Sequence, residues 1–337
     1  MKAIYITEPG HVEIREVEKP VRKPGEALLK LLYGGICGSD LGSYRGTFAY
    51  FEYPRIPGHG FSAEIVEIDD NEYGLEKGMV VTCNPYFNCG SCYSCQRGLV
   101  NACMDNQTMG CQRDGSFCEY ITMPLERIYD GKGLDPKLLA AIEPFCISYH
   151  GVQRAGIQKG DKVLVVGAGT ILNDSPEALE QATADITGQI DIRGNHNPYG
   201  FDVCIEAVGL PSTFQNCIDA CAFGGKLVLI GVGKQNLDFN FTLIQKKELN
   251  VFGSRNALKK NFLELIDLVR SGKVELGKII IDTYAAEDAV TAFAEFDQHA
   301  GEMLKVELDF TNFQEKIENK ITLRVHEREC LNTFSLC

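Results

Sequence analysis

The chain has 337 residues, a length that suits two domains of ordinary size. Its 33 basic and 46 acidic side chains leave a formal net charge of -13, which argues against nucleic acid or an anionic membrane surface as a partner. The N-terminal stretch is too polar for a signal peptide, and no run reaches the ~18 apolar residues of a membrane-spanning helix. We therefore expect a cytoplasmic globular protein.

Roughly the first 150 residues are predicted to be strand-rich. Short β-branched runs, such as "AEIVEI" and "GMVVTC", are separated there by glycine and proline turns. From Ile157 onward, apolar strands alternate with helical segments, a pattern typical of a parallel α/β sheet. The expected strands are 163–166, 203–208, 227–230 and 250–252, and the expected helices are 176–186 and 212–222.

The last part of the chain contains one further predicted helix and a tail. Apolar side chains recur at helical spacing before a Ser271-Gly272 stop, at Phe262, Leu265, Ile266 and Val269. The tail, residues 310–337, has no glycine or proline and nothing in it indicates chemistry. We expect it to be an extra or frayed segment of unknown role.

Four of the 14 cysteines lie close together in "CGSCYSCQRGLVNAC", with the spacing C-x2-C-x2-C-x7-C (Cys89, Cys92, Cys95 and Cys103). In a long chain without a leader, such cysteines indicate thiols and metal ligands rather than disulfides. Four thiolates in a glycine-containing loop can form the closed tetrahedral shell of a structural zinc. The alternative is a reduced cysteine-rich loop without metal.

A second candidate metal site begins with Cys37 in "GGICGSD" and His59 in "PRIPGHG", both flanked by glycine and expected on turns. A thiolate and an imidazole are good zinc ligands, and a catalytic zinc needs about three protein ligands plus water. Glu143 in "AIEPFC" offers a third ligand, although a Glu before Pro also suits the first turn of a helix. From the residues alone, Cys37 and His59 are either ligands or packed side chains.

A glycine turn follows the predicted strand 163–166 in "VLVVGAG". Gly167, Ala168 and Gly169 are expected to bring backbone N–H groups up to a pyrophosphate. The third glycine of the G-x-G-x-x-G fingerprint is replaced by Leu172, and a new helix start follows at once. Asp174 is best interpreted as the N-cap of that helix.

In this order, "GICGSD", the Gly-His pair, the four-cysteine loop, "IEPF" and "VLVVGAG" resemble the zinc-dependent medium-chain alcohol dehydrogenases, and most of all their polyol branch. The resemblance implies an α/β protein with a GroES-like, strand-rich catalytic domain, residues 1–148 completed by 256–309. It also implies an inserted Rossmann domain with a doubly wound parallel sheet, residues 149–255. Two zinc ions per chain, NAD or NADP, and a homo-oligomer, a dimer or a tetramer, are expected with it.

The resemblance also assigns roles to single residues. Cys37, His59 and Glu143 match the catalytic zinc ligands, and the four-cysteine loop matches the structural site. Asp40 matches the carboxylate that hydrogen-bonds the other ring nitrogen of the histidine, and Ser39 matches the hydroxyl that passes the substrate proton outward.

Three departures from the family pattern stand out. The family commonly has Glu directly after the zinc-binding histidine, where this chain has Gly60. The polyol branch usually has a histidine that relays the substrate proton, where this chain has Gly42. The proton relay is therefore expected to run through water or Tyr44. The segment 170–201 has room for one βαβ crossover of roughly 30 residues where the family has two. The first helix and second strand of the Rossmann domain, with the acid that selects the ribose, are therefore expected to be missing.

These expectations combine into a zinc-dependent oxidoreductase that transfers a hydride between NAD(P) and a secondary alcohol on a polyol or sugar acid, a small-molecule substrate. One alternative is a degenerate dehydrogenase that acts as a zinc-stapled binding or assembly protein, as the shortened Rossmann segment would favour. Another is a zinc-free quinone-reductase-like enzyme, which Cys37, His59 and the four-cysteine loop argue against.

Overall fold

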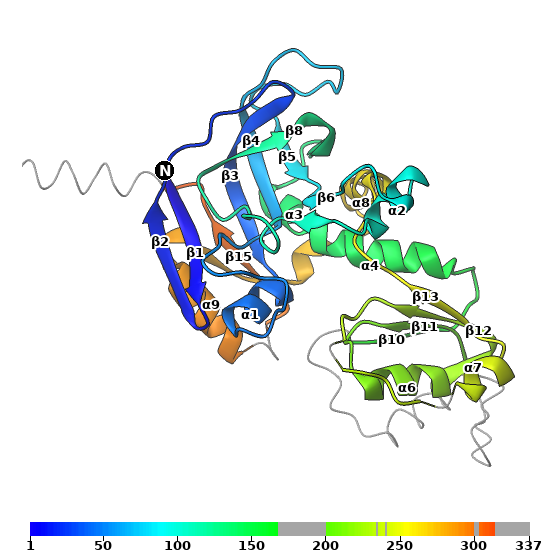
Figure 1. Cartoon of the computed structure of the whole chain (residues 1–337). Helices are drawn as coiled ribbons and strands as arrows, with labels where there is room; N and C mark the ends of the chain where they lie inside the picture. The colour runs from blue at the N-terminus through cyan, green and yellow to red at the C-terminus, as the bar shows by residue number, and fades with distance from the viewer. Residues whose placement is uncertain (168–199, 234, 240, 300–302, 314–337) are drawn as a thin grey trace, which may run out of the picture. The chain divides into compact units, whose positions relative to one another are not determined.

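The computed structural model describes residues 1–167, 200–233, 235–239, 241–299 and 303–313. Contacts divide the chain into two compact units. The first unit comprises Met1–Asn88, Asp105–Glu143 and the described residues from Ile266 onward; the second comprises Cys89–Met104 and the described part of Pro144–Leu265. The second unit is thus inserted into the chain of the first (Figure 1).

The first unit is built on a seven-stranded sheet of order β14-β15-β3-β4-β5-β9, in which β8 also pairs with β3. Only β14 and β15 pair in parallel; the other pairs described in this sheet are antiparallel. The strands are β3 (Glu26–Ile36), β4 (Gly60–Glu67), β5 (Val80–Cys83), β8 (Tyr120–Pro124), β9 (Ile128–Asp130), β14 (Ile280–Ala285) and β15 (Lys305–Asp309).

Shorter elements complete the first unit. Two antiparallel pairs lie beside the sheet: β1 (Lys2–Glu8) with β2 (His11–Glu16), and β6 (Tyr86–Phe87) with β7 (Gln107–Thr108). The helices are α1 (Gly38–Tyr44), α3 (Pro136–Ala140) and α9 (Ala289–Gln298), and α4 (Ile142–Ala155) begins at the end of this unit and continues in the second. Asp135 caps α3 by accepting the N–H of Lys137 at 2.8 Å.

Aromatic side chains fill the core of the first unit. The ring of Phe117 lies 6.5 Å from that of Phe293 and 6.0 Å from that of Phe310, and Phe313 packs on Phe310 at 5.4 Å. Phe310 and Phe313 are 2% and 1% exposed, so the first residues of the expected tail belong to this core. The rest of the tail lies outside the described residues.

The second unit contains a parallel sheet of order β10-β11-β12-β13. Its strands are β10 (Val163–Val166), β11 (Phe201–Glu206), β12 (Cys221–Leu229) and β13 (Asn250–Gly253). The helices described here are α2 (Tyr93–Gln96), α6 (Pro211–Ala220), α7 (Thr242–Lys246) and α8 (Lys259–Arg270), the last of which ends in the first unit.

Strand β11 shows why the strands of this sheet are nearly continuous apolar runs in the sequence. Cys204 packs in one core cluster with Phe214 of α6, whereas its neighbours Val203 and Ile205 in the strand pack in another cluster. A parallel strand covered on both faces carries apolar residues at nearly every position. The predicted parallel α/β sheet is confirmed, and so is the α/β fold class with an inserted unit.

Element boundaries differ from the prediction at one place in particular. The predicted helix 212–222 ends at Ala220, because Cys221 already pairs with Phe201 as the first residue of β12. The register then shifts to Val203 opposite Lys226, and Gly224 within this irregular stretch has a φ of +75°. The predicted helix 176–186 and the single crossover after Gly169 lie outside the described residues.

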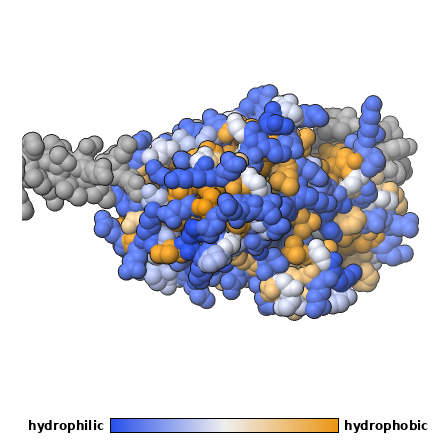
Figure 2. Space-filling model, turned by 90° about the horizontal axis from the view of Figure 1, so that it is seen from above, coloured by the Kyte–Doolittle hydropathy of each residue, from blue (hydrophilic) through white to orange (hydrophobic). Residues whose placement is uncertain are grey.

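The contacts place two segments differently from the expected domain boundaries of 1–148 and 256–309. The four-cysteine segment groups with the second unit, within which Arg255 donates to the carbonyl of Cys103 at 3.1 Å and Asn101 donates to the carbonyl of Arg255 at 3.0 Å. Residues 256–265 group with it too. Hydrophilic and apolar side chains are interspersed on the face in Figure 2, and no described helix has the length and apolar character needed to cross a bilayer.

Candidate active site

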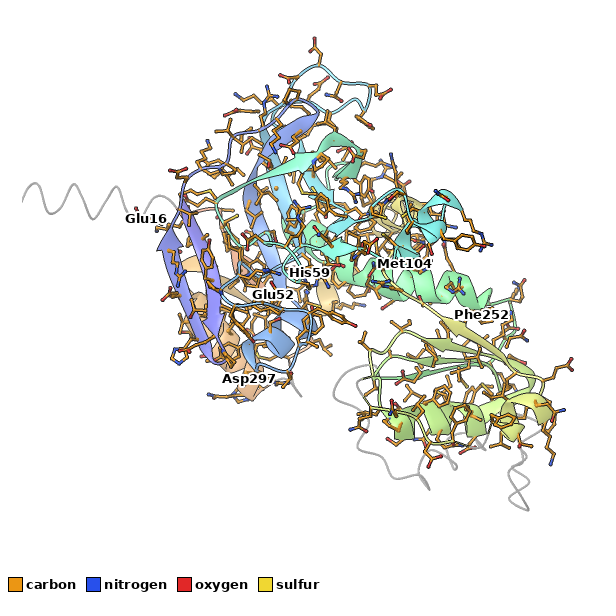
Figure 3. The ribbon with its side chains drawn as sticks, viewed as in Figure 1. Glu16, Glu52, His59, Met104, Phe252 and Asp297 are labelled. Carbon is orange, nitrogen blue, oxygen red and sulfur yellow. The ribbon has the colours of Figure 1, made fainter. Side chains whose placement is uncertain are left out.

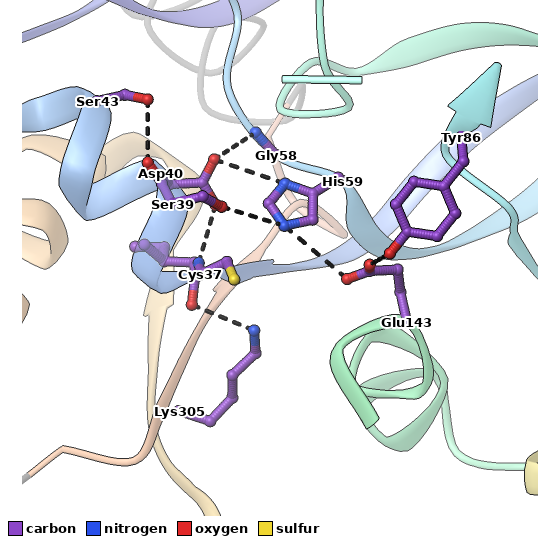
Figure 4. A network of polar contacts seen from close by, with 10 residues as sticks. Cys37, Ser39, Asp40, Ser43, Gly58, His59, Tyr86, Glu143 and Lys305 are labelled. Atoms are coloured by element: carbon purple, nitrogen blue, oxygen red, sulfur yellow. Dashed lines mark hydrogen bonds and ion pairs between the residues drawn. The ribbon is translucent and has the colours of Figure 1, made fainter. Parts of the chain in front are cut away.

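Asp40 connects the two loops that carry Cys37 and His59. Cys37 is the N-cap of α1, directly after β3, and Asp40 lies in the first turn of that helix, 1% exposed. Its Oδ2 accepts the N–H of Cys37 at 2.8 Å, and its Oδ1 accepts the N–H of Gly58 at 3.1 Å. One buried carboxylate therefore fixes both loops (Figure 4).

His59 lies among the strands of the first unit and is 6% exposed (Figure 3). It follows Gly58, whose φ is +92° and where a Cβ atom would lie 2.2 Å from the ring of Phe117, so only glycine fits there. The Nδ1 atom of His59 lies 3.8 Å from Oδ1 of Asp40. Its Nε2 atom lies 3.9 Å from Oε2 of Glu143 and 3.5 Å from Oγ of Ser39.

Glu143 lies in the first turn of α4 and is 2% exposed. The interpretation of Glu143 as a first-turn residue of a helix is therefore confirmed, and its role as a zinc ligand stays a prediction, which its position facing His59 permits. Its other oxygen, Oε1, accepts a hydrogen bond from the hydroxyl of Tyr86 on β6. No sequence motif singled out Tyr86, since the contact spans 57 positions.

The charges of these groups are interdependent. Burial by itself raises the pKa of the Cys37 thiol, but the adjacent His59 imidazolium lowers that pKa to about 7. Burial likewise disfavours the charged form of His59, but Asp40 and then Glu143 raise the pKa of its imidazole to about 10. The pocket thus stabilises a cation at the position of His59, and a metal ion that binds there must replace that proton.

The donor set of Cys37, His59 and Glu143 fits zinc. A thiolate, an imidazole nitrogen and a carboxylate oxygen are its usual ligands, and three protein ligands leave a position for water or substrate. The ligand atoms of this set are more widely spaced than those of the four-cysteine set. Among the described residues, the four cysteines form the group whose ligand atoms all lie within 4.8 Å of one another.

Backbone N–H groups donate to sulfurs of the four-cysteine set. Cys92 N–H points at the sulfur of Cys89 at 3.3 Å, and Cys89 N–H points at the sulfur of Cys103 at 3.2 Å. Backbone hydrogen bonds from Met104 and Cys95 lower the pKa of Cys92 to about 6. These donors favour thiolates, the form that binds a metal, and the set fits a closed structural zinc site.

The start of the expected pyrophosphate turn is described at Gly167, whereas Ala168 and Gly169 lie outside the described residues. Gly167 has a φ of +107°, and a Cβ atom there would lie 2.6 Å from Val208. Near the carboxyl ends of β11 and β12, a hollow of about 210 Å³ is lined by Glu206, Gly209, Leu210, Phe214, Leu229, Gly231, Gly233, Gln235 and Leu237. Ligands of parallel α/β sheets bind at this edge.

The positions that depart from the family pattern are also described. Gly60 begins β4. A Cβ atom at Gly42 would lie 3.3 Å from that of Phe48, so the space beside this position is taken. Tyr44 packs its ring on Phe293, with the centroids 5.7 Å apart. The expected relay through water or Tyr44 stays a prediction.

Comparison with known proteins agrees with these sites. A family profile described as "Alcohol dehydrogenase GroES-like domain" matches residues 23–132, and one described as "Zinc-binding dehydrogenase" matches residues 155–271. The first covers Cys37, His59 and the four cysteines.

Individual relatives match most of the chain. L-galactonate-5-dehydrogenase of Escherichia coli (strain K12) is 31% identical over 313 residues, 84% of this chain and 92% of that protein. Sorbitol dehydrogenase of Halalkalibacterium halodurans is 29% identical over 340 residues, 91% of this chain and 98% of that protein. A crystal structure from E. coli CFT073, described as a short chain alcohol dehydrogenase (rspB) complexed with NADH, has a TM-score of 0.77 and 27% identity, and the match covers 92% of this chain and 99% of that chain. The chain belongs to the zinc-dependent alcohol dehydrogenase family.

Proposed function

We propose that the protein oxidises a secondary alcohol on a polyol or sugar acid, with NAD(P) as hydride acceptor and zinc held by Cys37, His59 and Glu143. The observation that carries the proposal is the convergence of these three side chains around one polar centre, from the N-cap of α1, the loop before β4 and the first turn of α4. Relatives named as galactonate and sorbitol dehydrogenases support this substrate class.

Bound zinc would supply Lewis acidity, which lowers the pKa of a substrate hydroxyl. We assign the released proton to Ser39, which is half-buried at the start of α1 and whose Oγ lies 3.5 Å from Nε2 of His59. Ser43 holds this turn by donating to the carbonyl of Ser39 at 3.0 Å. The alcohol loses this proton and a hydride, and becomes a ketone.

Asp40 contributes by fixing the ligands rather than by touching the substrate. It accepts backbone N–H groups from the loops of Cys37 and His59 and lies beside the ring nitrogen of His59 that faces away from Glu143. A partner on this side sets the ring orientation of a metal-bound histidine.

We assign the four-cysteine set to a second, structural zinc. Its closed set of sulfurs, within 4.8 Å of one another, has no open position for substrate. We further propose a cytoplasmic homo-oligomer, a dimer or a tetramer. Both candidate metal sites need reduced thiols, which a reducing compartment maintains.

The test combines turnover with metal content. Zinc-loaded protein is offered NAD⁺ or NADP⁺ and a panel of polyols and sugar acids, and reduced cofactor is followed by its absorbance. We expect turnover with a member of this panel, and loss of turnover together with one zinc in His59→Ala. Full zinc loading without turnover and without NADH binding would instead favour a degenerate binding or assembly protein, which the dehydrogenase relatives do not favour.

A further inference from the structure

Tyr86 is a buried residue of the first unit whose hydroxyl contacts a candidate zinc ligand. It lies on β6 with 6% of its surface exposed, and it donates to Oε1 of Glu143, which is 2% exposed. Both partners are therefore shielded from water, where a hydrogen bond to a carboxylate is strong and its loss is costly.

The two oxygens of Glu143 have different surroundings. Oε1 receives the hydroxyl of Tyr86, whereas Oε2 lies 3.9 Å from Nε2 of His59 (Figure 4). Only Oε2 therefore faces another member of the candidate ligand set. A carboxylate held in this way offers one oxygen to a metal and keeps the other engaged.

The segment around Tyr86 is itself well supported. The N–H of Tyr86 donates to the side chain of Asn84 at 2.9 Å, and its carbonyl accepts from the guanidinium of Arg127. The ring of the next residue, Phe87, is contacted by Arg113 at 3.7 Å and by Arg127 at 4.5 Å from the centroid. The hydroxyl is thus carried on a backbone held from several sides, as a positioning group requires.

We propose that Tyr86 is the positioning residue of Glu143: it holds Oε1 so that Oε2 alone is presented to the zinc. The inference rests on the proposed function, in which Glu143 is a zinc ligand. With one atom each from Cys37, His59 and Glu143, the protein leaves a position for the substrate oxygen. A carboxylate free to turn would present both oxygens, or neither.

The test is Tyr86→Phe, which removes the hydroxyl and keeps the ring. We expect the zinc affinity of the Cys37–His59–Glu143 site, measured by competition with a chromophoric chelator, to fall about 10- to 100-fold, while the four-cysteine zinc is retained. With Co²⁺ as the probe, the visible absorption bands of the site should change in position or intensity, because they report the ligands around the ion.

Tyr33→Phe is the matched control. The hydroxyl of Tyr33 also contacts a carboxylate, Oδ2 of Asp309, at 3.4 Å, but that carboxylate is not a candidate ligand. This variant should leave both the affinity and the Co²⁺ spectrum unchanged. An equal effect of the two variants would mean that any lost phenol disturbs the unit, and would overturn the proposal.

Glu143→Gln and the double variant separate this inference from the proposed function. If Tyr86 acts through Glu143, then Tyr86→Phe should change the affinity of the Glu143→Gln protein by less than about twofold. If Glu143→Gln leaves affinity and spectrum unchanged, Glu143 is not a ligand and the proposed site fails. If Glu143→Gln weakens binding but Tyr86→Phe does not, or does so equally in both backgrounds, only the role of Tyr86 is refuted.

Discussion

Oδ1 of Asp40 lies 3.8 Å from Nδ1 of His59, while Oδ2 of the same carboxylate accepts the backbone N–H of Cys37. One side chain thus determines the position of two candidate ligands from different loops. We expect Asp40→Asn to lower zinc affinity at this site about 10- to 100-fold, because the histidine loses the anion that orients it. Isothermal titration of metal-free protein with zinc measures the effect.

Asp135→Asn provides the control for Asp40. Asp135 also accepts a backbone N–H at the start of a helix, that of Lys137 at 2.8 Å, but it caps α3 and is not a candidate ligand or partner. The control should leave zinc binding unchanged. Equal affinities in Asp40→Asn and the parent protein would contradict the role given to Asp40.

Two zinc ions per chain should be released in sequence. The Cys37–His59–Glu143 site leaves an open position, so a chelator should remove its ion before that of the closed four-cysteine site. Cys92→Ser should lower the melting temperature more than it lowers turnover, and His59→Ala should do the reverse. Thermal unfolding and turnover assays compare the two variants, and atomic emission follows the zinc content during chelation. A single zinc in the parent protein would be incompatible with this scheme.

Turnover should depend on Ser39 more than on any histidine outside the metal site. Ser39→Ala removes the hydroxyl 3.5 Å from Nε2 of His59 and should reduce kcat by about 10²- to 10⁴-fold, with zinc content and melting temperature unchanged. His150→Ala is the comparison, because Nε2 of His150 lies 3.3 Å from Asn101 within the second unit. Activity lost in His150→Ala with zinc and fold intact would mean that the relay is assigned to the wrong residue.

Dinucleotide binding should be weak. The sequence lacks the third glycine of the fingerprint, the ribose-selecting acid is expected to be missing, and each lost charge-assisted contact is worth ~1.5–3 kcal/mol. Two such losses weaken affinity by a factor on the order of hundreds. Fluorescence titration should therefore give an NADH dissociation constant far above that of an intact relative, with little preference over NADPH. A micromolar constant with clear preference for NADH would show that other residues, such as Asp174, have taken over these contacts.

The stability of the first unit should depend on the protonation of Glu307. This residue of β15 is 0% exposed, and neither carboxylate oxygen has a hydrogen-bond partner among the described residues. Burial raises its pKa from 4.5 to about 7, although Lys305 opposes the shift. Because the folded state holds this proton more tightly than the unfolded chain, the stabilisation is complete below about pH 4.5 and is lost as the pH rises through about 7.

Glu307→Gln tests this dependence by urea unfolding at two pH values. At pH 8 the variant should gain up to about 3 kcal/mol of unfolding free energy, since each pKa unit is worth about 1.4 kcal/mol, and the gain should shrink towards pH 5. The exposed Glu67, on β4 of the same sheet, gives the control Glu67→Gln, which should show no such pH dependence. A gain that is the same at both pH values would rule out titration of Glu307 as the cause.

Local sequence patterns predicted the helices and strands in which buried apolar residues recur at regular spacing. The apolar stripe of Phe262, Leu265, Ile266 and Val269 is buried on α8. The four predicted parallel strands are present, 163–166 with the predicted bounds and the other three with shifted bounds. The proximity of the glycine-flanked Cys37 and His59 could be predicted from the sequence, because the two motifs come together in the dehydrogenase family that the chain resembles.

Other features depend on contacts that no local pattern contains. The hydrogen bond of Tyr86 to Glu143 joins residues 57 positions apart, and nothing in "NPYFNC" marks that tyrosine. Alternation in the segment 305–309 favours one exposed face, yet Lys305 and Glu307 are only 6% and 0% exposed and thus buried, like Val306 and Leu308. Packing from other parts of the chain covers the second face, and sequence periodicity cannot report that.

The pairing of Ile36 with Val306 has a consequence for biosynthesis. Strand β3 leads directly into Cys37, but its neighbour β15 leaves the ribosome only after the whole inserted unit has been made. Domains generally fold as they emerge from the ribosome, so the inserted unit can form first. One edge of β3 stays unpaired until β15 has been synthesised. The strand that leads into Cys37 therefore gains its last neighbour late, and a nascent chain halted before β15 has its four-cysteine loop but lacks that support for the candidate ligand Cys37.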